Sequence, residues 1–447
     1  MVLSGTDWLT VTICCANIFL LEVTQSSLQS YWNGAISARG VSLTAIGAAT
    51  GLGAIGVVVV GPQVPKLIQR FGGGPNVLAG GTGMFLVMRC FLAGLDLVYD
   101  PTMIIAIMSL VYVFQFSAGA TVEACTASIV MSCTEEEDRT KANGIVQAFR
   151  ALGGVVGPPI GGVLYEHFGF APPILIVVGL MAINYIILLF MLFSGKMPPY
   201  ALDDEQKDGK SDSKSILRIP VVALAGSCFF FGCSGLFFPI TFIQPFLSAP
   251  PYNLGQTLVG FVLSMGFFGI LLGGGSAAAL EKKFGPVTAL AFSFGEMALG
   301  YMVLGPSPLI LSSILPVGEV WVPAVGNLIV QMGFGSTMTL TGPLCMSLAV
   351  ACGRNKEDAA QQIGVITVLA PGLSLFVIPA LGGLLADLFG AAWASTIGAI
   401  GFAVAGGLIV PSLAAMTRGM NLQHDAKEVA TADDGEQEEE MIPVTQY

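Results

Sequence analysis

Long apolar runs recur along almost the whole chain of 447 residues, separated by glycine, proline and charged breaks. A helix needs about 20 mostly apolar residues to cross the hydrocarbon core of a bilayer. Only 11% of the residues are charged, against about 25% in soluble proteins. The sequence therefore predicts an integral membrane protein with twelve transmembrane helices and no room for a large catalytic domain, so we expect no enzyme activity. The expected spans are residues 8–32, 42–64, 75–97, 102–132, 142–165, 171–194, 219–247, 257–280, 286–305, 321–350, 359–385 and 391–416.

A polar connector that mixes acids and bases, PPYALDDEQKDGKSDSK, divides the chain in two. It contains too few apolar residues to pack against a core. We expect an all-α membrane fold of two pseudo-symmetric six-helix bundles joined by this connector. The expected domains are an N-terminal bundle at 1–195, a cytosolic linker at 196–218, a C-terminal bundle at 219–416 and an acidic, disordered cytosolic tail at 417–447.

Basic residues are distributed asymmetrically between the two sets of expected loops. Fifteen lie on the side of the two termini, and only Arg39 lies in a loop on the opposite side. Loops rich in Lys and Arg stay in the cytosol, so both termini are expected there. The net charge of −11 leaves no basic surface of the kind that binds nucleic acid.

Two segments of the first half recur in the second half at nearly the same offset. Residues 65–72 (PKLIQRFG) align with 278–285 (AALEKKFG), and residues 158–169 (PPIGGVLYEHFG) align with 379–390 (PALGGLLADLFG). Each match lies at the equivalent span, which indicates a duplication. Two parallel-related halves place a substrate cavity near the membrane midplane between them.

The strongest local motif lies in the expected fifth span, where glycines and a proline form an ordered pattern. Small residues at a spacing of four let helices approach closely in lipid, but packing alone does not explain the whole order. The pattern resembles the antiporter motif of the drug:proton branch of the major facilitator superfamily. The preceding segment 134–139 (TEEEDR) resembles the vesicular amine transporter family, including its polyamine-like branch. The motif residues are Gly144, Gly153, Gly157, Pro158, Gly161 and Gly162.

This resemblance extends over both halves, but the chain departs from the family at several positions. The superfamily's loop after the second span carries an Asp where this sequence has Gln69, which is followed by Arg70 and Gly72. In the fourth span, Tyr112 stands where the family has an arginine, three residues before Gln115. The loop motif is therefore degenerate but still recognisable.

Two further residues of the monoamine carriers are also missing. Their second-span lysine aligns with Gly53, and their eleventh-span acid aligns with Val368. These differences argue against a monoamine substrate.

A polar stripe marks the expected first span. Glu22 lies near its middle, and Gln25, Gln29 and Asn33 follow at helical spacing. A charge at the bilayer centre costs roughly 2.5–3.5 kcal/mol, so the stripe should face a water-filled cavity rather than lipid. The family's amine carriers hold an acid at about this depth, which implies that Glu22 couples transport to protons. A structural hydrogen bond to another helix is the alternative.

Other ionisable residues fall within expected spans. Glu123 and Arg150 lie at similar depth on consecutive helices and form a possible ion pair, with a structural role and a gating role equally open. We group both with Glu22 as proton and substrate coupling residues. Arg89 and Glu296 lie in spans that the superfamily places at its periphery, where structural or snorkelling roles are expected.

The substrate cavity is expected to combine polar side chains from both halves. Phenylalanines of the expected seventh span offer an aromatic wall for an organic cation, although such runs usually pack or face lipid. The expected cavity residues are Gln25, Gln29, Tyr112, Gln115, Gln244, Asn327 and Gln331.

A glycine-rich segment of the expected second span matches a nucleotide-binding motif in the wrong structural context. Residues 51–56 (GLGAIG) have the spacing of a dinucleotide fingerprint, but they lie inside an apolar helix instead of a strand–turn–helix unit. The chain has no phosphate-binding GxxxxGK[ST] loop and only two histidines. We therefore expect no cofactor and no metal site.

Together these features predict a monomeric secondary transporter in the lipid bilayer that exchanges a small organic solute, an amine or polyamine-like compound, for protons. The alternatives are a uniporter or symporter of another metabolite, or a membrane receptor or scaffold that transports nothing. A vesicular, other organellar or plasma membrane location is equally compatible with the sequence.

Overall fold

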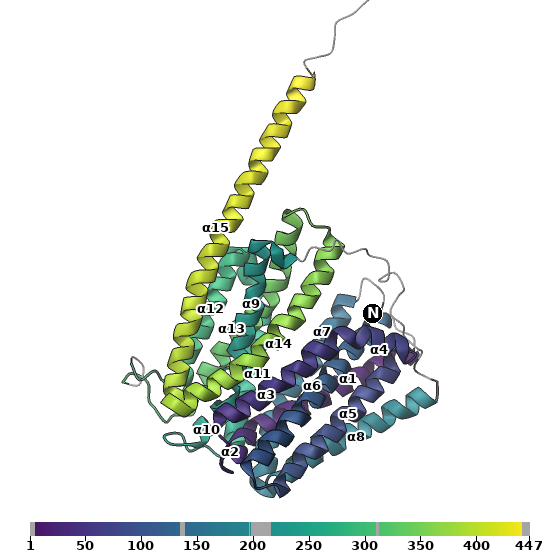
Figure 1. The fold of residues 1–447 in the computed structure, drawn as a ribbon, viewed down its shortest axis with the longest axis vertical. Helices are drawn as coiled ribbons and strands as arrows, with labels where there is room; N and C mark the ends of the chain where they lie inside the picture. Colours follow the sequence, from purple (N-terminus) through teal and green to yellow (C-terminus); the bar gives the residue numbers. More distant parts are fainter. Residues whose placement is uncertain (1–4, 135–138, 196, 198–215, 310–312, 440–447) are drawn as a thin grey trace, which may run out of the picture.

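The computed structural model describes residues 5–134, 139–195, 197, 216–309 and 313–439. In these residues the regular structure is helical (Figure 1). Most of the expected linker at 196–218 lies outside the described residues. The helices are α1 Gly5–Ser26, α2 Trp32–Ser37, α3 Leu43–Val60, α4 Val64–Arg70, α5 Gly74–Gly94, α6 Pro101–Ser132, α7 Arg139–Phe168, α8 Ala171–Phe193, α9 Pro220–Phe237, α10 Ile243–Ser248, α11 Gln256–Phe284, α12 Pro286–Leu304, α13 Trp321–Ala351, α14 Lys356–Phe389 and α15 Ala391–Glu439.

Eleven apolar segments in the described residues are long enough to cross a membrane. Each overlaps one of the spans expected from the sequence. The expected fifth span also forms a helix, α7, but this helix is not among the eleven. Arg150, Pro158 and Pro159, together with its glycines, lower its mean hydropathy.

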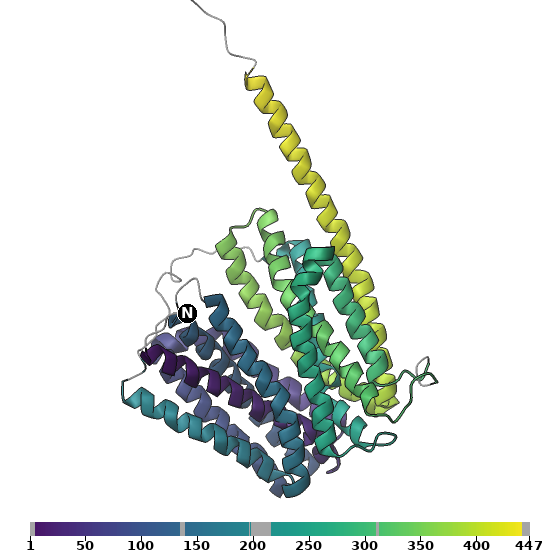
Figure 2. The same ribbon diagram turned by 180° about the vertical axis from the view of Figure 1, so that it is seen from behind.

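Buried apolar side chains form two clusters, one for each half of the chain. The first draws on residues 11–197 and the second on residues 216–413. Helices α1–α8 lie together on one side of the molecule and α9–α15 on the other, in both views (Figures 1 and 2). We call these groups the N-terminal half and the C-terminal half.

The backbone repeats the duplication seen in the sequence. Gly72, which ends the loop after α4, has φ +75°, and its counterpart Gly285 after α11 has φ +81°. Gly169 after α7 and Gly390 after α14 have φ +80° and +82°. Glycine adopts this left-handed conformation without steric cost, so the same turn is built at equivalent places in both halves.

Glycines allow the two halves to pack backbone against backbone. A Cβ at Gly260 on α11 would meet the Pro158–Pro159 backbone of α7, and a Cβ at Gly47 on α3 would meet the Pro379–Ala380 backbone of α14. Side chains at these glycines would force the halves apart. The α7–α11 and α3–α14 contacts therefore hold the halves together.

Two carboxylates fasten the halves at the end that carries α2 and α10, which we call the distal end (Figure 1). Glu166 of α7 accepts hydrogen bonds from Thr257 N (3.1 Å) and Thr257 Oγ1 (2.5 Å) at the start of α11. Asp387 of α14 accepts hydrogen bonds from Thr44 N (2.8 Å), Thr44 Oγ1 (2.7 Å) and Leu43 N (3.3 Å) at the start of α3. We call these contacts the distal latches.

The latches are equivalent under the repeat. Asp387 aligns with Glu166 at the offset of the second repeated segment, and Thr257 aligns with Thr44 at the offset of the first. In each latch an acid from one half caps the N-terminus of a helix in the other half, where the helix dipole favours negative charge. The duplication thus provides two matching closures at the same end of the molecule.

The last helix extends into residues 417–447, for which the sequence predicts a disordered tail. Helix α15 continues to Glu439 and projects beyond the rest of the C-terminal half (Figure 1). Residues 412–442 contain no proline and are rich in Ala and Glu, which favour helix. Residues 440–447 lie outside the described residues.

Candidate functional site

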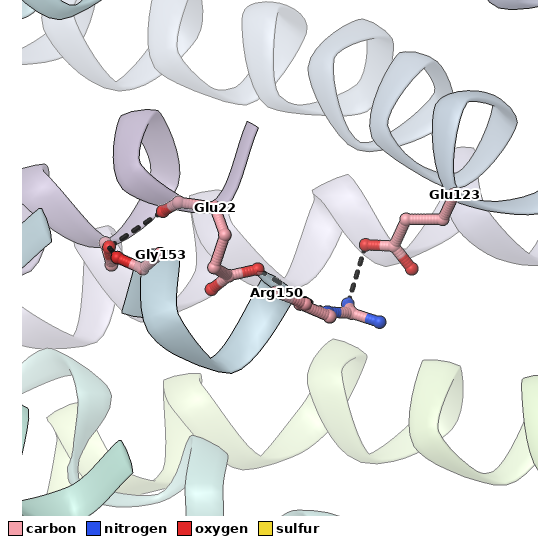
Figure 3. Close-up of polar contacts among 5 residues, drawn as sticks. Glu22, Glu123, Arg150 and Gly153 are labelled. Carbon is pink, nitrogen blue, oxygen red and sulfur yellow. Dashed lines mark hydrogen bonds and ion pairs between the residues drawn. The ribbon is translucent and has the colours of Figure 1, made fainter. Parts of the chain in front are cut away.

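Glu22, Arg150 and Glu123 come together from α1, α7 and α6 (Figure 3). Arg150 Nη2 donates a hydrogen bond to Glu123 Oε1 at 2.6 Å, and Arg150 Nε lies 3.5 Å from Glu22 Oε2. The guanidinium therefore bridges two carboxylates. We call this group the charge triad.

The two carboxylates are held differently. The contact with Glu123 is a short, charge-assisted hydrogen bond of the stronger kind. The contact with Glu22 is nearly an ångström longer. A proton added to Glu22 would therefore break the weaker of the two ion pairs and leave Arg150 paired with Glu123.

The triad side chains are not sealed in the core. The side chain of Arg150 is 39% exposed, that of Glu123 32% and that of Glu22 13%. Charged groups at membrane depth are tolerated where they face a water-filled cavity. Glu22, by contrast, is mostly enclosed and contacts the exposed Arg150.

The glycines of the expected antiporter motif bring α1 close enough to form the triad. A Cβ at Gly153 would lie 2.6 Å from Phe19 O and 2.8 Å from Glu22 Cβ. A Cβ at Gly157 would collide with Ser26 Oγ, and one at Gly161 with the Ser27 carbonyl. This face of α7 therefore needs residues without side chains.

An adjacent face of α7, one residue further round the helix, uses the same motif to contact the C-terminal half. Gly162 meets the backbone at Gln256, and the Pro158 carbonyl lies against Gly260. Gly144 differs from the other motif glycines because a Cβ there would have nothing within 4 Å. Most of the motif thus joins α1 and α11 to α7.

The polar stripe begins on α1 at the triad and continues to Asn33 on α2 at the distal end. Ser26 Oγ donates to Glu22 O (2.7 Å) and Gly153 O (3.2 Å). Half-buried Gln25 lies beside Gly119 of α6. Asn33 Nδ2 donates to Ile240 O of the C-terminal half at 2.5 Å.

Three of the expected cavity residues line one small cavity between the halves. Gln29, Asn327 and Gln331 surround a space of about 40 Å³. Asn327 Nδ2 donates to Val262 O at 3.1 Å, whereas the buried Gln331 Oε1 has no hydrogen-bond partner among the described residues. This volume is about that of one water molecule, so a solute requires the halves to separate here.

The other expected cavity residues lie elsewhere. Gln244 is buried on α10 at the distal end. Its side chain accepts a hydrogen bond from Gly34 N and donates hydrogen bonds to Ser248 and Gln256, and we call these contacts the distal closure. Tyr112 and Gln115 are buried within the N-terminal half. Sequence spacing did not reveal this separation, because it depends on which side of each helix meets the opposite half.

A larger cavity of about 700 Å³ lies between α3, α4, α5 and α6. Its lining is mainly apolar and includes none of the expected cavity residues.

Of the expected loop motif, Gln69 and Arg70 are exposed at the end of α4, and Gly72 adopts the positive φ that the turn requires.

Arg89 was expected to be structural or to snorkel; at 2% exposure it is buried and does not extend to the interface. The distal latches were not anticipated from the sequence. Glu166 and Asp387 form the distal latches, and their alignment within the repeat is the sequence feature that could have predicted them.

Within the described residues, no group of three or more His, Cys, Asp or Glu side chains is arranged to hold a metal ion.

The sequence profile of the Major Facilitator Superfamily matches residues 9–369 of this chain. The chain belongs to the Major Facilitator Superfamily. It is a multi-pass integral membrane protein with a transport function, and its relatives are transporters rather than enzymes. The resemblance expected from the glycine motif is thereby confirmed.

Individual relatives also include vesicular carriers. The chain is 26% identical over 312 residues to the human MFS-type transporter SLC18B1, an alignment that covers 68% of this chain and 64% of that protein. The mouse protein of the same name is 24% identical over 84% of this chain and 79% of its own length. The bovine synaptic vesicular amine transporter is 30% identical over 147 residues, covering 31% of this chain and 27% of that protein.

Solved structures share the fold of this superfamily member at low sequence identity. A bacterial homologue of the human lysosomal transporter Spinster, in an inward-facing and unoccupied conformation, matches with a TM-score of 0.69 and 13% identity, over 92% of this chain and 97% of that one. The nucleoside transporter NupG matches with a TM-score of 0.66 and 13% identity, over 90% and 98%.

Proposed function

We propose that this superfamily member is a proton-coupled antiporter of a small organic cation, an amine or polyamine-like compound. The observation that carries the proposal is the charge triad, in which Glu22 is the more weakly held of the two carboxylates. The partial similarity to a vesicular amine transporter supports a cationic solute.

Competition for one carboxylate explains the exchange. Ionised Glu22 attracts an ammonium group of the solute, whereas protonated Glu22 does not. Proton and solute therefore occupy Glu22 alternately. Arg150 keeps its hydrogen bond to Glu123 during this change, so the guanidinium remains paired when Glu22 is neutral.

Alternating access requires a closed end and an open end. The distal latches and the Asn33 and Gln244 hydrogen bonds close the distal end in this conformation. We propose that α7 completes a set of twelve spans in two six-helix bundles, and that the bundles rock about the small cavity at Gln29. With both termini in the cytosol, this conformation is the one closed to the opposite compartment.

The test is uptake by proteoliposomes that contain the purified chain. Labelled spermidine and a panel of monoamines are supplied with and without an imposed pH gradient. We expect gradient-driven uptake in the wild type and its loss in Glu22→Gln, which keeps the shape of the side chain but cannot ionise. Glu296→Gln is the matched control, because Glu296 is a second acid within the spans but lies outside the triad.

Unchanged gradient-driven uptake by Glu22→Gln would remove Glu22 from the mechanism. Uptake that ignores the pH gradient would indicate a uniporter. A correctly folded protein that transports no compound would instead support a receptor or scaffold.

A further inference from the structure

The apolar cavity of about 700 Å³ between α3, α4, α5 and α6 has no part in the proposed exchange. It is lined by the second half of α3 and the first half of α5. Because α3 begins at the distal latches, the cavity lies toward the opposite end of the N-terminal half, where α4 is placed (Figure 1). Ile55, Val59 and Phe114 line it and are exposed, so the cavity opens at the surface of the spans. We call it the α4 cavity.

The α4 cavity has the size of a ligand pocket, which is typically ~300–1,000 Å³. Part of its space arises from Gly80 on α5, where a Cβ would have no atom within 4 Å. An empty space of this size deprives its lining of dispersion contacts. In a membrane-spanning chain, the hydrocarbon that can enter such an opening is a lipid acyl chain.

The polar side chains of the lining are occupied by the backbone of their own segments. Ser117 Oγ donates to Val113 O at 2.7 Å, and Thr121 Oγ1 donates to Ser117 O at 2.8 Å. Asn76 Nδ2 donates to Phe71 O at 2.8 Å. The interior of the cavity is therefore suited to hydrocarbon rather than to a polar solute.

Helix α4 places positive charge beside this apolar space. Leu67 and Phe71 line the cavity, whereas Lys66 and Arg70 are exposed. Neither base forms an ion pair in the described part of the chain, and residues 61–76 contain no acid. Basic residues at a membrane surface attract anionic lipid headgroups. The charge thus complements a ligand that is apolar at one end and anionic at the other.

We propose that the α4 cavity binds one anionic phospholipid, with an acyl chain in the cavity and the phosphate at Lys66 and Arg70. Lipid tails elsewhere in the bilayer are as apolar as the cavity, so the headgroup charge selects the lipid and the cavity fixes its position. With both termini in the cytosol, as proposed above, this end meets the leaflet that is rich in anionic lipid. The site is separate from Glu22.

Native mass spectrometry of the full chain in detergent tests this proposal. Phosphatidylserine and phosphatidylcholine with identical chains are added at equal concentration, and the lipid-bound forms are counted. One basic residue at a membrane surface strengthens anionic lipid binding about fivefold, and two about twenty-five-fold. We expect one tightly bound phosphatidylserine, preferred over phosphatidylcholine by about that larger factor. Lys66→Gln or Arg70→Gln should weaken its binding about fivefold, and the double substitution about twenty-five-fold.

A second set of variants tests whether the acyl chain enters the cavity. Gly80→Phe fills the cavity with a ring and should abolish the tightly bound phosphatidylserine. Gly179→Phe is the matched control, because Gly179 on α8 is also exposed and also has nothing within 4 Å of an added Cβ, but it lies outside the cavity lining. It should bind phosphatidylserine like the wild type. If Gly80→Phe does not fold, the exposed Lys66 and Arg70 substitutions keep the test decisive.

The repeat supplies a control for general attraction between bases and lipid. Lys282 and Lys283 are exposed and align with Gln69 and Arg70, so replacing both lysines with glutamine removes as much charge as the double substitution on α4. Phosphatidylserine binding should not change.

Four results would overturn the proposal. They are equal binding of the two lipids, tight phosphatidylserine binding by Gly80→Phe, an equal loss of binding when Lys282 and Lys283 are replaced, and displacement of the lipid by soluble glycerophosphoserine. The last result would show that a phosphate ester alone occupies the site. Because no readout involves transport, the outcome does not depend on the proposed antiport.

Discussion

We predict that the distal latches control how often this transporter opens at its distal end. The test replaces the two latch carboxylates, with Glu166→Gln and Asp387→Asn made singly and together. Each substitution keeps the shape of the side chain and one carbonyl oxygen, but it removes the charge that attracts the helix N-terminus. We expect the distal end to open more often in each variant.

The hydrogen bonds of the latches set the magnitude. Glu166 accepts two hydrogen bonds and Asp387 accepts three. Hydrogen bonds to charged groups contribute ~1.5–3 kcal/mol, but exposed ion contacts contribute only ~0–1 kcal/mol. Taking ~1 kcal/mol for each latch, a single substitution raises the ratio of open to closed molecules about fivefold and the double substitution about thirtyfold. If ~1% of wild-type molecules are open at the distal end, about a quarter of the double-variant molecules are open there.

The assay is double electron–electron resonance between spin labels on the two halves. Leu97 and Trp393 lie near the distal end and are 81% and 41% exposed, so cysteines there accept labels after the native exposed Cys90 and Cys352 are replaced with serine. The long-distance population should increase in the order wild type, single variants, double variant.

Asp100→Asn is the control for this experiment. Asp100 also caps a helix at the distal end, because its Oδ1 accepts hydrogen bonds from Thr102 N (2.8 Å) and Met103 N (2.9 Å), but it does so within its own half. It should leave the distance distribution unchanged. The reasoning is refuted if the double variant matches the wild type, or if Asp100→Asn opens the distal end as much.

The same experiment has an expected pH dependence at Glu166, which lies just beyond the expected span. Hydrogen bonds from the Thr257 hydroxyl and then from its backbone N–H lower the pKa of Glu166 below its usual value. A lowered pKa means that the latch is fully formed above the ordinary carboxyl pKa of about 4.3 and weakens only as the pH falls through the lower value. The contribution of Glu166 to distal closure should therefore be constant between about pH 5.5 and 8, and opening of this latch by mild acidification would contradict the assignment.

Two further predictions concern the charge triad and its support. Gly157→Ala should destabilise the protein by ~1–3 kcal/mol, because the added methyl group meets Ser26 and overpacks the α1–α7 contact. Thermal melting in detergent measures this loss of stability. The control is Gly144→Ala, which should be nearly neutral because the space around Gly144 is open. Arg150→Lys should reduce gradient-driven uptake at least tenfold while preserving the fold, because a lysine lacks the planar guanidinium that bridges Glu22 and Glu123. Uptake rates equal to those of the wild type would show that a single positive charge at this position is sufficient.

The sequence by itself determined the class of protein and the positions of its helices. Runs of apolar residues long enough to cross a bilayer leave few alternatives to helix, since backbone groups in lipid must be satisfied within the segment. The repeated segments predicted matching turns, and Gly72 and Gly285 have nearly the same positive φ. Superfamily membership, inferred from the glycine pattern around Gly157, is confirmed by the family match.

Only the tertiary structure decided which polar residues meet. The sequence placed Glu123 and Arg150 at one depth, but the convergence of Glu22 on the same guanidinium depends on how closely α1 approaches α7. It also grouped Gln244 with Gln29, although Gln244 belongs to the distal closure. Periodicity shows which residues share a helix face, but the partner of that face is fixed by contacts between helices far apart in the chain.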